Sequence, residues 1–214
     1  RTPMTSIRAF SEILRDAPEL SAQDMNKYAS IIHDEALRLT RLLDDLLDLS
    51  VLESGQVSLN MRSGRLVAVI DQAVAAAGVA DEWLTIRRER AREDIALTSD
   101  LDRLAQVFIN LIANARKYCD ARAPVLTIQV ACHGDTAVVD FVDNGSGIPT
   151  ESQALVFEKF SRVSDGESAG GAGLGLAICR EIMARLGGDI AYLPGQGGAA
   201  FRVTLPLSLA RAAQ

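Results

Sequence analysis

The chain has 214 residues, of which 48% are hydrophobic and 23% are charged, and its net charge is −6. This length predicts one good hydrophobic core plus a smaller helical unit, so we expect one or two domains. The negative charge argues against nucleic-acid binding, and no uncharged apolar stretch is long enough to cross a membrane. The three cysteines lack C-x-x-C spacing, which favours reduced thiols in a cytoplasmic setting without a zinc site.

Two helices are expected at the N-terminus. The first runs to about Asp16, and a turn over residues 17–20 leads to Ser21, which begins the second helix as a capping-box-like residue with Asp24. The second helix runs to about Ser54, with a coiled-coil seam of Met25, Ala29, Ile32, Ala36, Leu39, Leu43 and Leu46. Further leucines widen this stripe beyond what one partner helix can cover. We therefore expect the hairpin, residues 1–54, to form half of a dimeric four-helix bundle.

Residues 55–64 are rich in glycine, serine and polar amides, and we expect them to be a linker. A second domain over residues 65–208 follows, and residues 209–214 form a tail. Its expected helices cover residues 66–77 and 100–118, and its expected strands cover 85–89, 95–98, 125–132, 136–142, 188–192 and 200–205. Neighbouring strands with interspersed helices predict an α+β fold, with a mixed sheet covered by helices on one face.

The helix over residues 100–118 carries two amides beside its apolar stripe. Asn110 and Asn114 share one helical face, and Lys117 and Tyr118 lie close to it. A half-buried amide without a partner costs about 1–3 kcal/mol, so something polar must meet this face. On this helix alone, neighbouring backbone and a bound ligand explain the amides equally well.

Two glycine-rich turns favour the ligand. The run DNGSG from Asp143 to Gly147 follows an alternating apolar segment, and the run GAGLGL from Gly171 to Leu176 opens an amphipathic helix. Glycines before a helix expose backbone N–H groups that suit phosphate. Neither run fits the dinucleotide-binding or P-loop pattern. Together with the Asn/Lys face they predict a nucleotide site with a metal.

The ordered set NLIANARKY, DNGSG, FEKFSR and GAGLGL resembles the four ATP-site motifs of sensor histidine kinases of two-component systems, whose ATP-binding domain is of the GHKL (Bergerat) type. The opening RTPMTSIRAFSEIL is similar to the end of that family's phosphoacceptor motif, H-E-x-R-T-P. The phosphorylated histidine of that motif falls three places before Arg1, so we expect the chain as given to bind ATP without labelling itself. His33 is not expected to replace it, because no R-T-P follows.

The resemblance implies a protein-histidine kinase that uses ATP and Mg²⁺. It implies Mg²⁺ at Asn110 and Asn114, adenine at Asp143 with Gly145 and Gly147 admitting the ring, and Tyr118 near the adenine. It implies phosphate binding by Lys117, by Arg162 and by Gly171, Gly173, Leu174, Gly175 and Leu176. Thr2 matches the family position associated with phosphate removal, so Thr2, Lys117 and Arg162 are the expected catalytic residues. Phe157 and Phe160 are expected to pack in the core and to anchor a mobile lid over residues 161–172.

The implied partners are a second copy of the chain, the receiver domain of a response regulator and a sensor domain upstream, through which the full-length protein could be membrane-anchored. No nucleic acid and no membrane contact by this segment are expected. Two alternatives stay open: an ATPase or serine kinase of the same superfamily, and a non-catalytic dimeric docking scaffold. The R-T-P segment and the long helices count against the first, and the intact ATP-site motifs count against the second.

Overall fold

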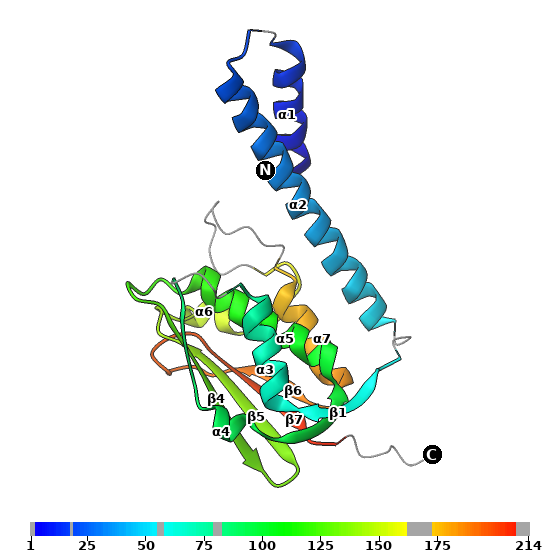
Figure 1. Ribbon diagram of the computed structural model, residues 1–214, viewed down its shortest axis with the longest axis vertical. Coiled ribbons are helices and arrows are strands. Elements are labelled where there is room, and N and C mark those ends of the chain that lie inside the picture. Colours follow the sequence, from blue (N-terminus) through cyan, green and yellow to red (C-terminus); the bar gives the residue numbers. More distant parts are fainter. Residues whose placement is uncertain (1–2, 18, 55–57, 79–82, 162–172, 209–214) are drawn as a thin grey trace.

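The computed structural model describes residues 3–17, 19–54, 58–78, 83–161 and 173–208. In these residues a helical hairpin projects from an α/β domain (Figure 1). The hairpin consists of α1 (Pro3–Asp16) and α2 (Ala22–Glu53), and the Phe10 and Tyr28 rings stack between them with centroids 5.4 Å apart. Ser21 caps α2 by accepting the Asp24 backbone N–H. The predicted hairpin and its capping residue are therefore confirmed.

The α/β domain contains a five-stranded mixed sheet in the order β2-β4-β5-β7-β6, in which the β2–β4 pair is parallel and the other pairs are antiparallel. Its strands are β2 (Thr85–Arg88), β4 (Val125–His133), β5 (Thr136–Asp143), β6 (Asp189–Tyr192) and β7 (Ala200–Pro206). The longer helices α3 (Leu66–Ala76), α5 (Leu101–Tyr118) and α7 (Gly175–Arg185) cover one face of this sheet (Figure 1). This is the predicted α+β arrangement. Two single-turn helices, α4 (Arg90–Glu93) and α6 (Thr150–Gln153), were not predicted.

A second, two-stranded sheet joins β1 (Met61–Arg65) to β3 (Ala96–Asp100). Residues 61–64 were expected to belong to the linker, so this strand is a difference from the prediction. Its sequence, MRSGR, lacks the alternation that marks a half-buried strand. Distant contacts hold it instead: Asn60 donates its backbone N–H to Asp100, and Arg62 pairs with Asp102 at 2.5 Å.

The core lies between the helices and the five-stranded sheet. The apolar stripe of α5 is buried as predicted, and it consists of Leu104, Val107, Phe108, Leu111 and Ala115. Phe108 is fully buried, and its ring centroid lies 5.2 Å from that of Phe141 on β5. This pair therefore fixes α5 on the sheet, and α5 is the helix that carries the candidate amides.

We expect Phe108→Ala to lower the free energy of unfolding by about 3–5 kcal/mol, because a buried ring is lost and a cavity remains. Thermal and urea denaturation of the whole chain measure this change. Phe160→Ala is the matched control, since Phe160 is 59% exposed and should cost much less. Equal losses in the two variants would contradict the core position of Phe108.

The last turns of α2 dock on the α/β domain. Leu49 and Leu52 are buried in its core, and Arg185 of α7 donates to the Leu52 carbonyl. At the same place Asp48 accepts from Gln106 at 3.0 Å, and Glu53 pairs with Lys159 at 2.5 Å. The last turns of α2 are therefore held against the domain that carries the glycine turns.

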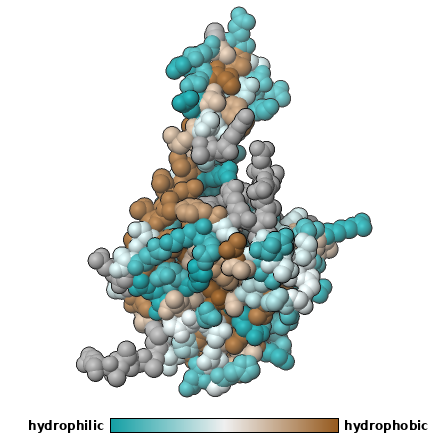
Figure 2. All heavy atoms as spheres, turned by 180° about the vertical axis from the view of Figure 1, so that it is seen from behind, coloured by the Kyte–Doolittle hydropathy of each residue, from teal (hydrophilic) through white to brown (hydrophobic). Residues whose placement is uncertain are grey.

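Other apolar residues of the hairpin face outward. Met25, Ala29, Ala36 and Leu43 of the predicted seam are exposed, whereas Ile32, Leu39 and Leu46 are partly buried. Figure 2 shows apolar side chains gathered along the hairpin down to its junction with the α/β domain. None of the helices in the described ranges is long and apolar enough to span a bilayer. The outward seam leaves an apolar surface that this single chain does not cover.

Candidate functional site

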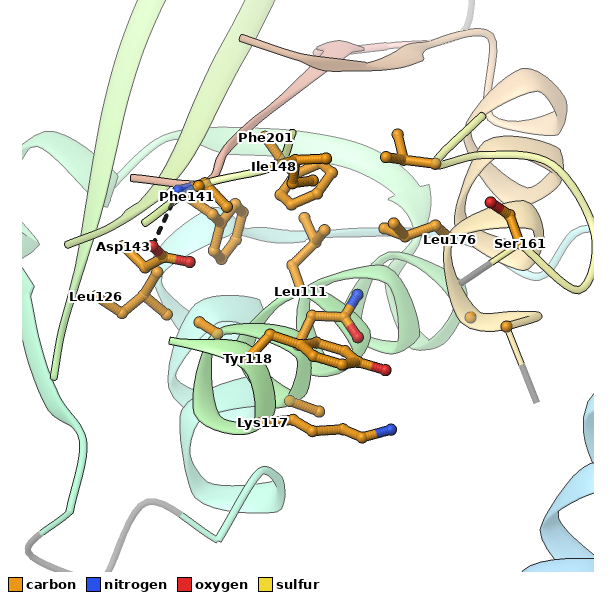
Figure 3. Close-up of a pocket in the computed structure, with 18 of the residues that line it drawn as sticks. Leu111, Lys117, Tyr118, Leu126, Phe141, Asp143, Ile148, Ser161, Leu176 and Phe201 are labelled. Atoms are coloured by element: carbon orange, nitrogen blue, oxygen red, sulfur yellow. Dashed lines mark hydrogen bonds between the residues drawn. The ribbon is translucent and has the colours of Figure 1, made fainter. Parts of the chain in front are cut away.

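A cavity of about 540 Å³ opens between α5, the turn that follows β5 and the N-terminus of α7 (Figure 3). Its apolar part is formed by side chains from α5 and the sheet, including Leu111, Leu126, Phe141 and Phe201. Its polar part is formed by glycine-containing turns, which expose backbone groups, and by charged side chains. The predicted site residues that line it are Asn114, Lys117, Tyr118, Asp143, Gly147, Gly173, Gly175 and Leu176. The motifs therefore meet around one cavity although they are far apart in the sequence.

Asp143 stands at the end of β5 and is 8% exposed. Its Oδ1 atom accepts the backbone N–H groups of Gly145 and Ala199, each at 2.9 Å, and the second of these bonds is dashed in Figure 3. Within the described residues both hydrogen bonds of this carboxylate fall on Oδ1. The Oδ2 atom is therefore left to accept from a donor that enters the cavity, such as an amine.

The turn after Asp143 is held from several sides. Ser146 donates its N–H to Asp120 at 2.7 Å, and this bond holds the pKa of the Asp120 carboxyl below its usual value. Asn144 accepts from the Val125 N–H at 2.8 Å and donates to the Ala123 carbonyl at 3.0 Å. These ties join the turn to the loop that follows α5. Asp120 and Asn144 were not predicted as functional, because their partners lie far away in the sequence and only the fold brings them close.

Glycines keep this turn open. A Cβ at Gly145 would stand 2.9 Å from Asp120 Oδ1, and Gly147 has a φ of +80°, which favours glycine. A third glycine, Gly198, lies in the loop before β7 and was not predicted as a site residue. A Cβ there would stand 2.0 Å from the Asp143 carbonyl oxygen. Gly198 therefore permits the close backbone approach that brings Ala199 N–H to Asp143.

The polar residues in the last turn of α5 line the cavity, whereas Asn110, one turn earlier, does not. Asn114, Lys117 and Tyr118 line the cavity, and Lys117 Nζ lies 4.7 Å from the Tyr118 ring centroid. Asn110 is not among the residues that line it: its amide oxygen faces Gly175. The nearby Cys179 thiol is buried and donates to the Val107 carbonyl at 3.8 Å. Burial raises the pKa of Cys179 to about 12, so this cysteine stays a thiol at neutral pH.

The N-terminus of α7 points into the cavity from the opposite side. Gly173 has a φ of +71° and accepts the Phe160 N–H at 3.0 Å. Leu174 is the N-cap residue, and no side chain of the described residues caps the helix, so its first N–H groups stay available. The Leu174 side chain is fully buried in the core, so this residue can meet a ligand only through its backbone.

The two phenylalanines of the FEKFSR run differ. Phe157 is partly buried and packs edge-on against Phe201 at 6.2 Å, as predicted. The prediction for Phe160 was wrong: it is 59% exposed with a φ of +62°, because its backbone turns to meet Gly173. Thr2, Arg162, Gly171 and residues 162–172 of the expected lid lie outside the described residues.

The residues present fit a magnesium ion that takes most of its oxygen donors from a bound phosphate compound and from water. The described ranges contain no group of three His, Cys, Asp or Glu side chains able to hold a metal by themselves. Mg²⁺ characteristically takes one or two protein oxygens and fills its shell with phosphate oxygens and water. The Asn114 amide beside Lys117 supplies such an oxygen at the polar end of the cavity.

A carboxylate with an open oxygen, an amide side chain and an uncapped helix N-terminus lie around one cavity in a domain joined to a helical hairpin. Residues 99–209 match the family model of the histidine kinase-, DNA gyrase B- and HSP90-like ATPases, and residues 1–55 match that of the His Kinase A (phospho-acceptor) domain. The chain belongs to the sensor histidine kinase family of two-component systems.

Among its relatives, the sensor protein VanS of Enterococcus faecium is 32% identical over 96% of this chain and 54% of that protein. The probable sensor histidine kinase TcrY of Mycobacterium tuberculosis is 35% identical over 97% of this chain and 43% of that protein. The chain thus spans about half the length of these relatives.

Solved structures share the fold at lower identity. The Acinetobacter baumannii histidine kinase AdeS has a TM-score of 0.73 at 24% identity, covering 97% of this chain and 96% of that one. Histidine kinase ThkA, in complex with response regulator protein TrrA, has a TM-score of 0.75 at 24% identity, covering 97% of this chain and 58% of that one. Both likenesses extend over the hairpin and the α/β domain together.

Proposed function

We propose that this chain is the catalytic core of a sensor histidine kinase, which binds Mg²⁺ and ATP in the cavity and transfers the γ-phosphoryl group to a histidine of the helical bundle. The observation that carries this proposal is the cavity itself. An open carboxylate oxygen stands beside its apolar part, and uncapped helix N–H groups stand at its polar side. An adenine amine can donate to Asp143 Oδ2 while the phosphates reach α7.

Each expected site residue has a defined task in this proposal. Lys117 offsets phosphate charge, and Tyr118 covers the adenine edge. The backbone of Gly173 to Leu176, with Gly171, receives phosphate oxygens, and Arg162 stabilises the charge that builds on the γ-phosphoryl group. Mg²⁺ bound by Asn114 and Asn110 would neutralise the charge of the phosphate oxygens.

The reaction is a phosphoryl transfer. The bond between the γ-phosphorus and the β–γ bridging oxygen breaks, a nitrogen–phosphorus bond forms on the histidine, and ADP leaves. An aspartate of a response regulator then accepts the phosphoryl group. Thr2, four residues after the acceptor position in the motif, orients water when the same protein removes the phosphate.

The bundle is proposed to form from two copies of the chain. The exposed seam residues Met25, Ala29, Ala36 and Leu43 support this, because a second hairpin would cover them. Residues 1–54 then serve dimerisation and residues 65–208 serve catalysis. The response-regulator partner is supported by the ThkA–TrrA complex, and an upstream sensor domain by the greater length of the relatives. We place this segment in the cytoplasm, where ATP is available.

Incubating the full-length protein with γ-labelled ATP tests the reaction. We expect a label that is lost in acid and kept in base, which is the behaviour of phosphohistidine. Acid-stable label would support a serine kinase instead, and ATP hydrolysis without label would support an ATPase. Light scattering tests the dimer, and a strict monomer at tens of micromolar would contradict the bundle. A protein that neither binds ATP nor becomes labelled would be a docking scaffold.

A further inference from the structure

The cavity is not lined by the α/β domain alone, because α2 of the hairpin contributes Arg41 and Asp45 to it. These residues are one helical turn apart and share a face. Leu49, one turn after Asp45, and Leu52 are buried in the core and anchor the end of this helix. Figure 3 shows Lys117 pointing toward the side of the cavity where the ribbon of α2 passes. The charged residues of α2 are thus fixed beside the polar end.

Arg41 is free to bind an anion. Its Nε atom donates to the Leu37 carbonyl at 3.3 Å, and within the described residues no carboxylate oxygen lies within 4.0 Å of its nitrogens. The two terminal nitrogens therefore keep their N–H donors. A guanidinium with this fork of donors matches phosphate oxygens in charge and geometry.

Asp45 has the opposite character. Burial, and then the charges of Asp48 and Asp44, raise the pKa of its carboxyl, while Arg41 opposes this shift. Arg41 and Asp45 do not form an ion pair within the described residues, although the spacing would allow one. The Arg41 guanidinium and the Asp45 carboxyl group thus line the same cavity without forming an ion pair with each other.

We propose that Arg41 binds the polyphosphate of the nucleotide from the hairpin and that Asp45 weakens the same interaction by repulsion. This inference rests on the proposed function, since it assigns the nucleotide as ligand. The cavity then takes its base contacts from the α/β domain and part of its phosphate contacts from α2. By linkage, nucleotide binding strengthens the docking of α2 on the domain, because only the docked arrangement offers Arg41.

Calorimetric titration of the whole chain with ATP and with adenosine tests this. Arg41→Ala should weaken ATP binding about fivefold to tenfold. This is the lower end of the effect expected for a hydrogen bond to a charged group, because Arg41 is exposed to solvent. Adenosine binding should not change, since adenosine has no phosphate. Arg41→Lys should recover part of the loss, and Asp45→Asn should tighten ATP binding severalfold. The matched control is Arg38→Ala, because Arg38 lies on the same helix, pairs with Glu35 at 3.7 Å and does not line the cavity.

Circular dichroism and thermal unfolding of each variant establish that the fold is kept. Equal effects of Arg41→Ala and Arg38→Ala, or equal losses for ATP and adenosine, would overturn the role of Arg41. If Asp45→Asn weakened ATP binding, the repulsive role would be wrong. If the unchanged chain bound neither ligand, the proposed nucleotide function would fail, and the role of Arg41 would fail with it. Unchanged adenosine binding with a selective ATP loss is the pattern that supports both.

Discussion

Asn114→Ala is expected to abolish most Mg²⁺-dependent ATP binding and turnover while the fold remains intact. Asn114 is the amide that lines the cavity, and alanine is a good helix former at its half-exposed position on α5. Loss of groups that only orient metal ligands typically costs 10–100-fold, so loss of a direct ligand should cost at least about a hundredfold. The measurement is ATP affinity with and without Mg²⁺, together with phosphoryl transfer in the full-length protein.

The control for this variant is Asn26→Ala, which removes an exposed amide on α2 outside the residues that line the cavity. It should bind ATP like the unchanged chain. If Asn114→Ala kept its turnover and its response to Mg²⁺, the amide would have no metal role. The same titration of Asn110→Ala tests the second proposed ligand, which faces α7 in the structure.

Gly198→Ala is expected to weaken ATP binding at least about tenfold. The added methyl would stand 2.0 Å from the Asp143 carbonyl oxygen and 2.8 Å from its Oδ1 atom. Because the nearest obstacle is backbone, no side-chain rotation relieves it, and the loop must move away from Asp143. The Ala199 N–H would then release the carboxylate that accepts the adenine amine. Titration with adenosine measures this loss without any contribution from phosphate.

Gly195→Asn in the same loop is the matched control. A Cβ added at Gly195 would meet no atom of the described residues within 4 Å, and asparagine tolerates the φ of +77° better than most residues. The adenosine affinity of this variant should stay close to that of the unchanged chain. If Gly198→Ala bound adenosine equally well, the close approach of this loop to Asp143 would not matter for the site.

The hairpin, the mixed sheet and α5 could be predicted because each carries a local signal. The seam of α2 repeats with coiled-coil spacing, β4 and β5 alternate around the turn at Gly134, and the α5 stripe has helical period. The polar face with Asn114 and the glycine turn at Asp143 were also visible as local patterns, whereas the roles of their residues were predicted from the resemblance to sensor histidine kinases.

Residues positioned by distant contacts could not be predicted. β1 becomes a strand only because β3 pairs with it, and Asp120 and Asn144 gain their roles from backbone groups that the fold brings near. Phe160 looks like a core aromatic in sequence, but its backbone has a φ of +62° and its ring is 59% exposed. Arg41 lies in an amphipathic helix like any surface arginine. Only the docking of α2 places it beside the cavity.

A crystal structure of the chain with Mg²⁺ and a non-hydrolysable ATP analogue would show directly whether this cavity binds the nucleotide. We expect the adenine amine at Asp143 Oδ2, the metal at the Asn114 amide, and the phosphates between the N-terminus of α7 and Lys117. An analogue bound outside this cavity, or bound with its base away from Asp143, would contradict it.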